Sequence, residues 1–300
     1  MDINNILQED FEKWLITMGY ADTTVYASVN YVRDFFEWLR PSPIKDLSQI
    51  NGQVIRSYFN YLQRRPNKRR PGGLSDHYIN SHLNALKRLS CYLQESGKEV
   101  FEIDLPRRSV TSTPRIILTT SEVLAMYRVC GTVSEAHAEL LGLRDRAMLG
   151  IYYGCGLRRS EGAALNVPDI LLKEKLVYVR KGKNYRERYV PMTEAVKEDV
   201  VNYIQIAREK ILSFKNARHE ALFLSMQVKR LCGNQIIGRV QLLARVAGIQ
   251  KEVGLHTLRH SIATHLLQSG MTLEEVSQFL GHSSLESTQI YTHIANEQIS

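Results

Sequence analysis

Apolar residues recur at helical spacing through most of this chain, and that spacing limits the fold more than any other feature. Residues three or four positions apart share one face of a helix, so such a run predicts a helix with a buried face. Two runs precede residue 100, with a break at Pro71-Gly72-Gly73 between them. Their apolar positions are Val25, Val29, Val32, Phe35, Phe36 and Leu39, then Ile79, Leu83, Leu86, Leu89 and Leu93. We therefore expect an all-helical first domain.

A polar segment at residues 106–116 interrupts the helical pattern. It contains Pro106 and Pro114, with hydroxyl and basic residues between them, and it has no apolar periodicity. This composition is typical of an exposed linker between domains. We place the first domain at residues 1–105 and the second at residues 117–300, a division that suits a chain of 300 residues.

The second domain opens with a signal for a helix start. Thr119 and Glu122 have the spacing of a capping box before an apolar run. Another helix is expected around residues 143–153, where Gly154-Cys155-Gly156 ends it. Arg158 then lies at the start of the following helix.

A β-hairpin is predicted in the middle of the second domain. Residues 176–180 and 188–190 are of β-forming type, and Lys181-Gly182-Lys183-Asn184 between them has the composition of a turn. This hairpin would carry Lys183 near its tip. Everything after about Glu194 is expected to return to helix, so the predicted fold class is mainly α with a small antiparallel β-sheet.

The C-terminal part is predicted to consist of short, well-delimited helices. Residues 256–268 form one, and residues 272–280 form another that Gly281 ends. A second capping-box spacing at residues 283–286 places Tyr291 on or just beyond a final helix.

The composition favours a nucleic-acid partner over a membrane. The formal net charge is +8, and no segment approaches the roughly 20 consecutive apolar residues that a spanning helix needs. The basic loop at residues 64–70 fits either a solvated loop or a phosphate contact. The first residues lack the pattern of a signal peptide, so we expect a cytoplasmic protein. Four scattered cysteines are expected to be reduced and without a catalytic role: Cys91, Cys130, Cys155 and Cys232.

Five dispersed residues have the chemistry needed to break a phosphodiester without a metal ion. Such a reaction requires cations for the non-bridging oxygens, a proton donor for the leaving oxygen and a nucleophile. Taken singly, each residue has an ordinary alternative, such as a surface arginine or a half-buried tyrosine. The five residues are Arg158, His256, Arg259, His282 and Tyr291.

His256, Arg259 and His260 lie at i, i+3 and i+4, so they share one face of the predicted helix. Two histidines on one face also fit a zinc site. Against zinc, Arg259 would place a fixed positive charge between the ligands, and no third ligand stands at a suitable local spacing. We favour a packing role for His260, and we expect neither a metal nor a cofactor.

These motifs resemble those of the tyrosine site-specific recombinases, the family that includes the phage integrases and the Xer proteins. The first domain resembles the core-binding (SAM-like) domain of that family, and the second resembles its catalytic domain. Five motifs in the family's order and spacing are hard to explain by the ordinary alternatives. They are the arginine motif at 156–161, the lysine hairpin at 182–191, His256-x-x-Arg259-His260, Leu280-Gly281-His282 and Tyr291-Thr292-His293.

The resemblance implies a mechanism that conserves bond energy and therefore needs no ATP. Tyr291 would attack a DNA phosphodiester and form a 3′-phosphotyrosyl link with a free 5′-hydroxyl, which a second strand later reverses. Arg158 and Arg259 would hold the non-bridging oxygens. Lys183 would protonate the leaving 5′-oxygen.

The remaining implied roles belong to two histidines and one carboxylate. His256 would assist proton transfer from the tyrosine, and His282 would hydrogen-bond the phosphate. Glu161 would orient the surrounding groups rather than react.

The resemblance also implies the partners. These are double-stranded DNA with inverted-repeat core sites, three further copies of the chain in a homo-tetramer on two duplexes, and an accessory or directionality protein. Two other functions use related parts: a type IB topoisomerase-like enzyme that relaxes DNA, and a DNA-binding accessory protein without activity.

Overall fold

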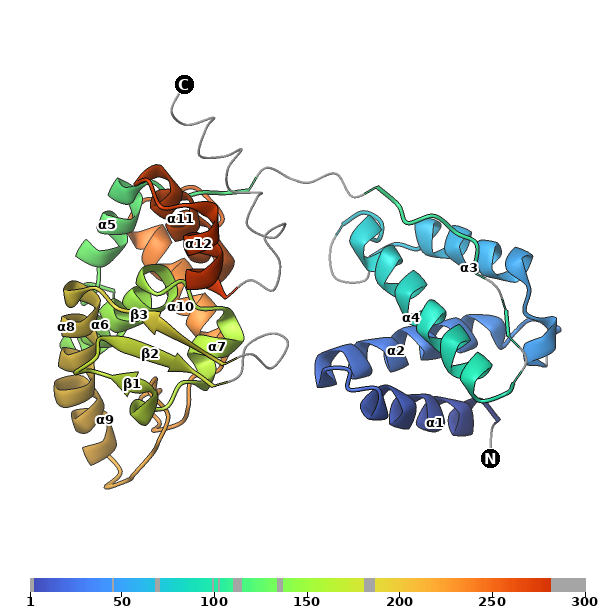
Figure 1. Cartoon of the computed structure of the whole chain (residues 1–300), viewed down its shortest axis with the longest axis horizontal. Coiled ribbons are helices and arrows are strands. Elements are labelled where there is room, and N and C mark those ends of the chain that lie inside the picture. The colour runs from blue at the N-terminus through green and yellow to red at the C-terminus, as the bar shows by residue number, and fades with distance from the viewer. Residues whose placement is uncertain are drawn as a thin grey trace. The chain divides into compact units, whose positions relative to one another are not determined.

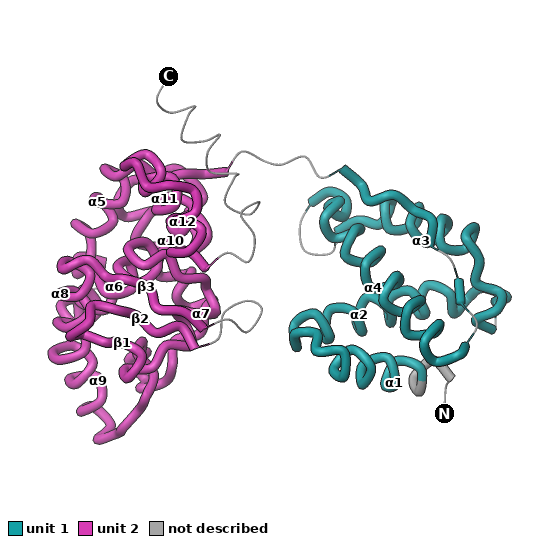
Figure 2. Tube along the Cα trace, in the orientation of Figure 1, with its two compact units in different colours: residues 1–112 teal, residues 113–300 magenta. Residues whose placement is uncertain are grey.

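The computed structural model describes residues 3–44, 46–67, 71–98, 100–101, 103–109, 115–133, 137–180 and 187–281. The chain divides into two compact units, Met1–Ser112 and Thr113–Ser300, shown in two colours in Figure 2. The division falls inside the segment that the sequence indicates as a linker. Among the described residues, no helix is both long and apolar enough to cross a membrane.

The first unit is built from helices, as the apolar spacing predicts. Helix α2 packs against both α1 and α4, and the two predicted runs provide the buried faces of α2 and α4. Phe35 and Tyr58 are fully buried in its core. The helices are α1 (Ile3–Thr17), α2 (Asp22–Leu39), α3 (Gly52–Arg64) and α4 (Asp76–Glu95), with a 3₁₀ turn at Leu47–Gln49.

The second unit surrounds a small antiparallel sheet with helices (Figure 1). The sheet order is β1-β2-β3, and Val177 of β2 pairs with Val190 of β3. Its strands are β1 (Ile170–Leu171), β2 (Leu176–Val179) and β3 (Arg188–Pro191). Its helices are α5 (Thr120–Arg128), α6 (Ala138–Leu149), α7 (Arg159–Ala164), α8 (Glu194–Asn202), α9 (Glu209–Ser213), α10 (Gly233–Val246), α11 (Leu255–Gln268) and α12 (Leu273–Leu280).

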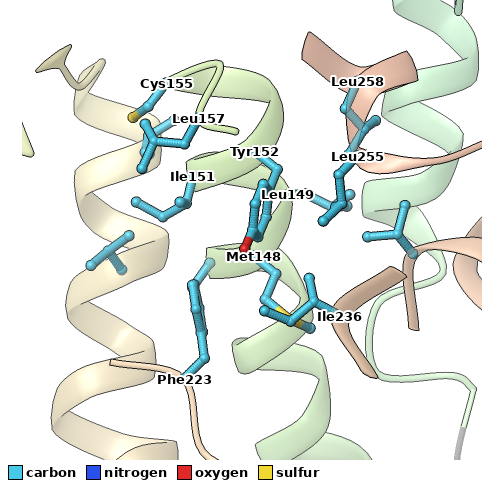
Figure 3. Packing of buried hydrophobic residues seen from close by; sticks show 14 of the residues in the cluster. Met148, Leu149, Ile151, Tyr152, Cys155, Leu157, Phe223, Ile236, Leu255 and Leu258 are labelled. Atoms are coloured by element: carbon cyan, nitrogen blue, oxygen red, sulfur yellow. The ribbon is translucent and has the colours of Figure 1, made fainter. Parts of the chain in front are cut away.

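The core of the second unit lies where α6 continues into a π-helical segment, Gly150–Gly154, and meets α11. Tyr152, Leu255 and Ile236 all belong to this core, and all three are buried (Figure 3). The mainly helical fold with a small sheet is confirmed. The predicted capping box is also present, because the Thr119 side chain accepts from the Glu122 amide and Glu122 accepts from the Thr119 amide.

Two predictions about elements were wrong. Helix α6 begins at Ala138, before the predicted start near residue 143, because Gly142 does not break it. A Cβ on Gly142 would lie 2.6 Å from the Cα atom of Gly131, so this glycine serves a close approach of two backbones. Residues 214–232 are not helical. Instead, Leu222 donates its amide to the Leu165 carbonyl at 2.9 Å, which places an extended segment across the core.

Gly162 of α7 and Gly238 of α10 provide a matched pair for stability. A Cβ on Gly162 would lie 2.5 Å from the Tyr152 ring, whereas a Cβ on Gly238 would meet nothing within 4 Å. We expect Gly162→Ala to lower the free energy of unfolding by about 1–3 kcal/mol through overpacking, and Gly238→Ala to raise it by about 0.5–1 kcal/mol through helix propensity. Denaturation followed by circular dichroism measures both. Equal changes in the free energy of unfolding for the two substitutions would contradict the close packing of Gly162 against Tyr152.

Candidate active site

A sharp turn places Arg158 at the start of α7. Gly156 has φ +59°, in the left-handed region that glycine tolerates, and a Cβ there would lie 2.9 Å from Leu280 Cδ2. Glycine is therefore required both by the turn and by the close approach of α12. Arg158 follows as the residue preceding α7, as the sequence predicts.

Arg158 is held from two directions. Its Nη1 donates to Glu161 Oε1 at 2.8 Å, and its Nη2 donates to the Gly281 carbonyl at 3.0 Å. The Arg158 amide also donates to Glu161 Oε2 at 2.9 Å, which caps the helix. One contact lies within the turn, and the other reaches the C-terminal end of α12.

Glu161 accepts from a second arginine that the sequence analysis left without a role. Arg188, the first residue of β3, donates Nη1 to Glu161 Oε1 at 3.0 Å and Nη2 to Oε2 at 2.8 Å. Burial would raise the pKa of Glu161, but hydrogen bonds and positive charge from Arg188 and Arg158 outweigh it and hold that pKa at about 2. The available signal was a basic residue shortly before Val190-Pro191 in the lysine hairpin motif.

Arg259 on α11 is 3% exposed and contacts the same turn. Its Nη1 donates to the Gly156 carbonyl, and its Nη2 donates to the Leu280 carbonyl at 2.7 Å. The carbonyls at the end of a helix carry partial negative charge and favour cations. The end of α12 therefore brings together Arg158 and Arg259, which are about a hundred residues apart in the sequence.

His256 lies in the first turn of α11, next to the arginines and open to solvent. Partial burial, followed by the positive charges of Arg259, Arg159 and Arg158, lowers the pKa of this imidazole below its ordinary value. His260 is half-buried one turn later, and the two rings have centroids 6.4 Å apart. Neutral His256 beside two guanidinium groups is suited to exchange a proton near an anion.

Three of the predicted site residues lie outside the described part of the chain: Lys183, His282 and Tyr291. The predicted capping box at 283–286 and the basic residues 68–70 lie outside it too. Strands β2 and β3 flank Lys183, and Gly281, with φ +63°, ends α12 directly before His282.

Comparisons with known proteins agree over nearly the whole chain. The phage integrase family profile matches residues 117–298. The chain is 32% identical to Tyrosine recombinase XerC 2 of Ralstonia nicotianae over 99% of this chain and 84% of that protein. It is 30% identical to Tyrosine recombinase XerD of Staphylococcus epidermidis, over 99% of this chain and 96% of that one.

Solved structures show the same fold. A crystal structure of the XerH site-specific recombinase bound to palindromic difH substrate has a TM-score of 0.74 at 20% identity, covering 99% of this chain and 82% of that one. A lambda integrase dimer bound to a core site has a TM-score of 0.64 at 17% identity, covering 96% and 94%. At these identities the likeness concerns the fold.

Proposed function

The chain belongs to the phage integrase family, and from that premise we propose that it is a site-specific DNA recombinase that cleaves and rejoins strands through a 3′-phosphotyrosyl intermediate. The observation that carries this proposal is that Arg158 and Arg259 both donate hydrogen bonds to backbone carbonyls at the end of α12. Two fixed guanidinium groups at one turn, beside the segment that leads to Tyr291, suit a phosphate undergoing attack by that residue.

The two arginines have a defined task in this chemistry. A guanidinium stays charged at any working pH and can donate parallel hydrogen bonds to two phosphate oxygens. Negative charge grows on the non-bridging oxygens as the phosphorus becomes five-coordinate. Cations that are already in place stabilise that charge without reorganisation, which is where such sites gain most of their rate.

The other groups of the proposed set supply proton transfer. Tyr291 has a phenol with an ordinary pKa near 10, so it is a weak nucleophile at neutral pH until a base and nearby cations favour the phenolate. His256 takes up that proton, and Lys183 protonates the leaving 5′-oxygen. His282 donates a hydrogen bond to the phosphate.

The lowered pKa of His256 sets a pH dependence for cleavage. Because the imidazole must be neutral to accept a proton, and its pKa lies below the ordinary 6.5, it is already neutral at pH 7. We expect the acidic decline of the cleavage rate to have its midpoint below pH 6.5, so the rate should change little between pH 8 and pH 7. Single-turnover adduct formation between pH 5 and 8 measures it. A midpoint above 6.5, or an unchanged acidic limb in His256→Asn, would contradict this role.

The proposed partner is double-stranded DNA with inverted-repeat core sites, bound by a tetramer on two duplexes. Support comes from the basic charge and from the relatives: the XerH structure holds a palindromic substrate, and lambda integrase is a dimer on a core site. We place the protein in the cytoplasm, where such DNA lies. An accessory protein would set the direction of recombination.

Covalent trapping tests the proposed function. The protein is incubated with nicked suicide duplexes that carry a pool of inverted-repeat sites, in the presence of a chelator, and SDS-resistant adducts are recovered and sequenced. We expect an adduct at a preferred site. DNA binding without any adduct would favour an inactive accessory protein, and relaxation of supercoils without strand exchange would favour a topoisomerase-like enzyme.

A further inference from the structure

Arg188 connects three segments that carry proposed catalytic residues. Through Glu161 it joins the turn that carries Arg158, and it is the first residue of β3, the strand that follows Lys183 in the sequence. Its side chain also packs on Gly281, where a Cβ would lie 2.5 Å from Arg188 Cδ and 2.6 Å from its Nε. His282 follows Gly281 directly.

We infer that Arg188 is a positioning residue for DNA cleavage, which shares the Glu161 carboxylate with Arg158 and thereby sets the direction of the Arg158 guanidinium. This inference rests on the proposed function. Arg188 does not touch the phosphate in this role. It acts through Glu161 and through the backbone at Gly281.

The charge balance explains why two arginines are needed. The Glu161 side chain is 1% exposed, and a buried carboxylate must be paired and hydrogen-bonded on both oxygens. With Arg188 present, Arg158 gives Glu161 its backbone amide but only Nη1 of its guanidinium, and it keeps Nη2 on the Gly281 carbonyl. Without Arg188, the Arg158 guanidinium would have to donate to both Glu161 oxygens. It would then turn away from the Gly281 carbonyl and from the phosphate position.

A second buried arginine–carboxylate pair in the same unit offers a comparison. Arg239 pairs with Asp145, and its Nε donates to both carboxylate oxygens at 2.9 Å. The Nε of Arg188, by contrast, is buried without an acceptor among the described residues. Side-chain exposures are similar, 14% and 0% for Arg239 and Asp145 against 13% and 1% for Arg188 and Glu161. Because an unpaired buried donor costs stability, the Arg188 geometry suits orientation better than stability.

Arg239→Met is therefore the matched control for Arg188→Met. Each variant removes one guanidinium from a buried carboxylate in the second unit. Glu161 keeps its bonds from Arg158, so Arg239→Met should lose at least as much thermal stability as Arg188→Met. We expect only Arg188→Met to lose cleavage, by about 100-fold, the effect of a shift of about 1 Å in a reacting geometry. DNA affinity should change less than about 3-fold in both, since both guanidinium side chains are largely buried against carboxylates.

A double variant separates positioning from damage to the fold. In Arg188→Met/Glu161→Gln the side chain at position 161 is an uncharged amide, which attracts the Arg158 guanidinium less than a carboxylate does. We therefore expect cleavage about 10-fold faster than in Arg188→Met alone. The measurements are single-turnover adduct formation on the trapped site, DNA affinity by fluorescence anisotropy and melting temperature, all below the melting range of each variant.

The outcomes distinguish this inference from the proposed function. Suppose that the wild type forms the adduct. If Arg188→Met then cleaves within about 3-fold of the wild-type rate, or at the same rate as Arg239→Met, the positioning role is overturned and the proposed function stands. A double variant no faster than Arg188→Met also overturns the positioning role. If the wild type forms no adduct on any site, the proposed function fails, and the positioning role fails with it because there is no cleavage to position.

Discussion

A Tyr291→Phe variant is expected to bind its DNA site with nearly unchanged affinity and to form no covalent adduct. The substitution keeps the ring and removes only the oxygen that would attack phosphorus, so binding contacts remain while the nucleophile is lost. The rate of adduct formation should fall below detection, which is the largest single effect that we expect for this protein. SDS-resistant adduct on the trapped site and anisotropy on the same duplex measure the two properties.

Tyr189→Phe is the matched control because Tyr189 is an exposed tyrosine that directly follows Arg188 on β3. It is 59% exposed on β3, so its hydroxyl is accessible. We expect this variant to form the adduct at the wild-type rate. Loss of adduct in Tyr189→Phe, or its survival in Tyr291→Phe, would reject Tyr291 as the nucleophile.

The sequence also allows the attached residue to be identified directly. No lysine or arginine follows Arg259, so trypsin releases residues 260–300 as one peptide, and Tyr291 is its single tyrosine. After nuclease treatment, a nucleotide mass on that peptide would identify Tyr291. A nucleotide mass on any other peptide would identify a different nucleophile.

The helices near the site were predictable because their signals are local. The apolar spacing within 256–268 and the glycine after Leu280 gave α11 and α12, and the Gly154-Cys155-Gly156 break placed Arg158 at a helix start. Each of these depends on neighbours within a few residues. Helix α6 begins before the predicted residue 143, and the close approach of Gly142 to Gly131 within it can be seen only in the fold.

The site itself was predictable in residue types but not in its connections. The sequence motifs indicated Arg158 and Arg259 as cations, but motif spacing does not show that both side chains reach the backbone at the end of α12. The motifs also left Arg188 without a role, because a basic residue in a strand is ordinarily solvated. Only the fold brings Arg188 to the buried carboxylate of Glu161, which lies 27 positions earlier.

Arg259→Ala is expected to slow cleavage by about 1000-fold, at the upper end of the effect of removing one preorganised donor from charge developing in a transition state. Arg259 is nearly inaccessible and donates to the Gly156 and Leu280 carbonyls, so its loss also releases the turn that holds Arg158. For that reason the effect should exceed that of a surface contact. DNA affinity should weaken far less, because the fixed Arg259 guanidinium acts mainly on the negative charge that develops on the phosphate oxygens in the transition state.

Arg259→Lys tests whether geometry or charge is responsible. Lysine keeps the positive charge but is a compact point donor without the planar fork, so it cannot hold two carbonyls and a phosphate at fixed angles. We expect it to recover less than about a tenth of the cleavage lost in Arg259→Ala. Arg245→Ala, which removes an exposed charge from α10, should leave the rate within about 3-fold of wild type. Full activity in Arg259→Lys would mean that charge alone suffices, and the two carbonyl contacts would then serve the stability of the turn and not the reaction.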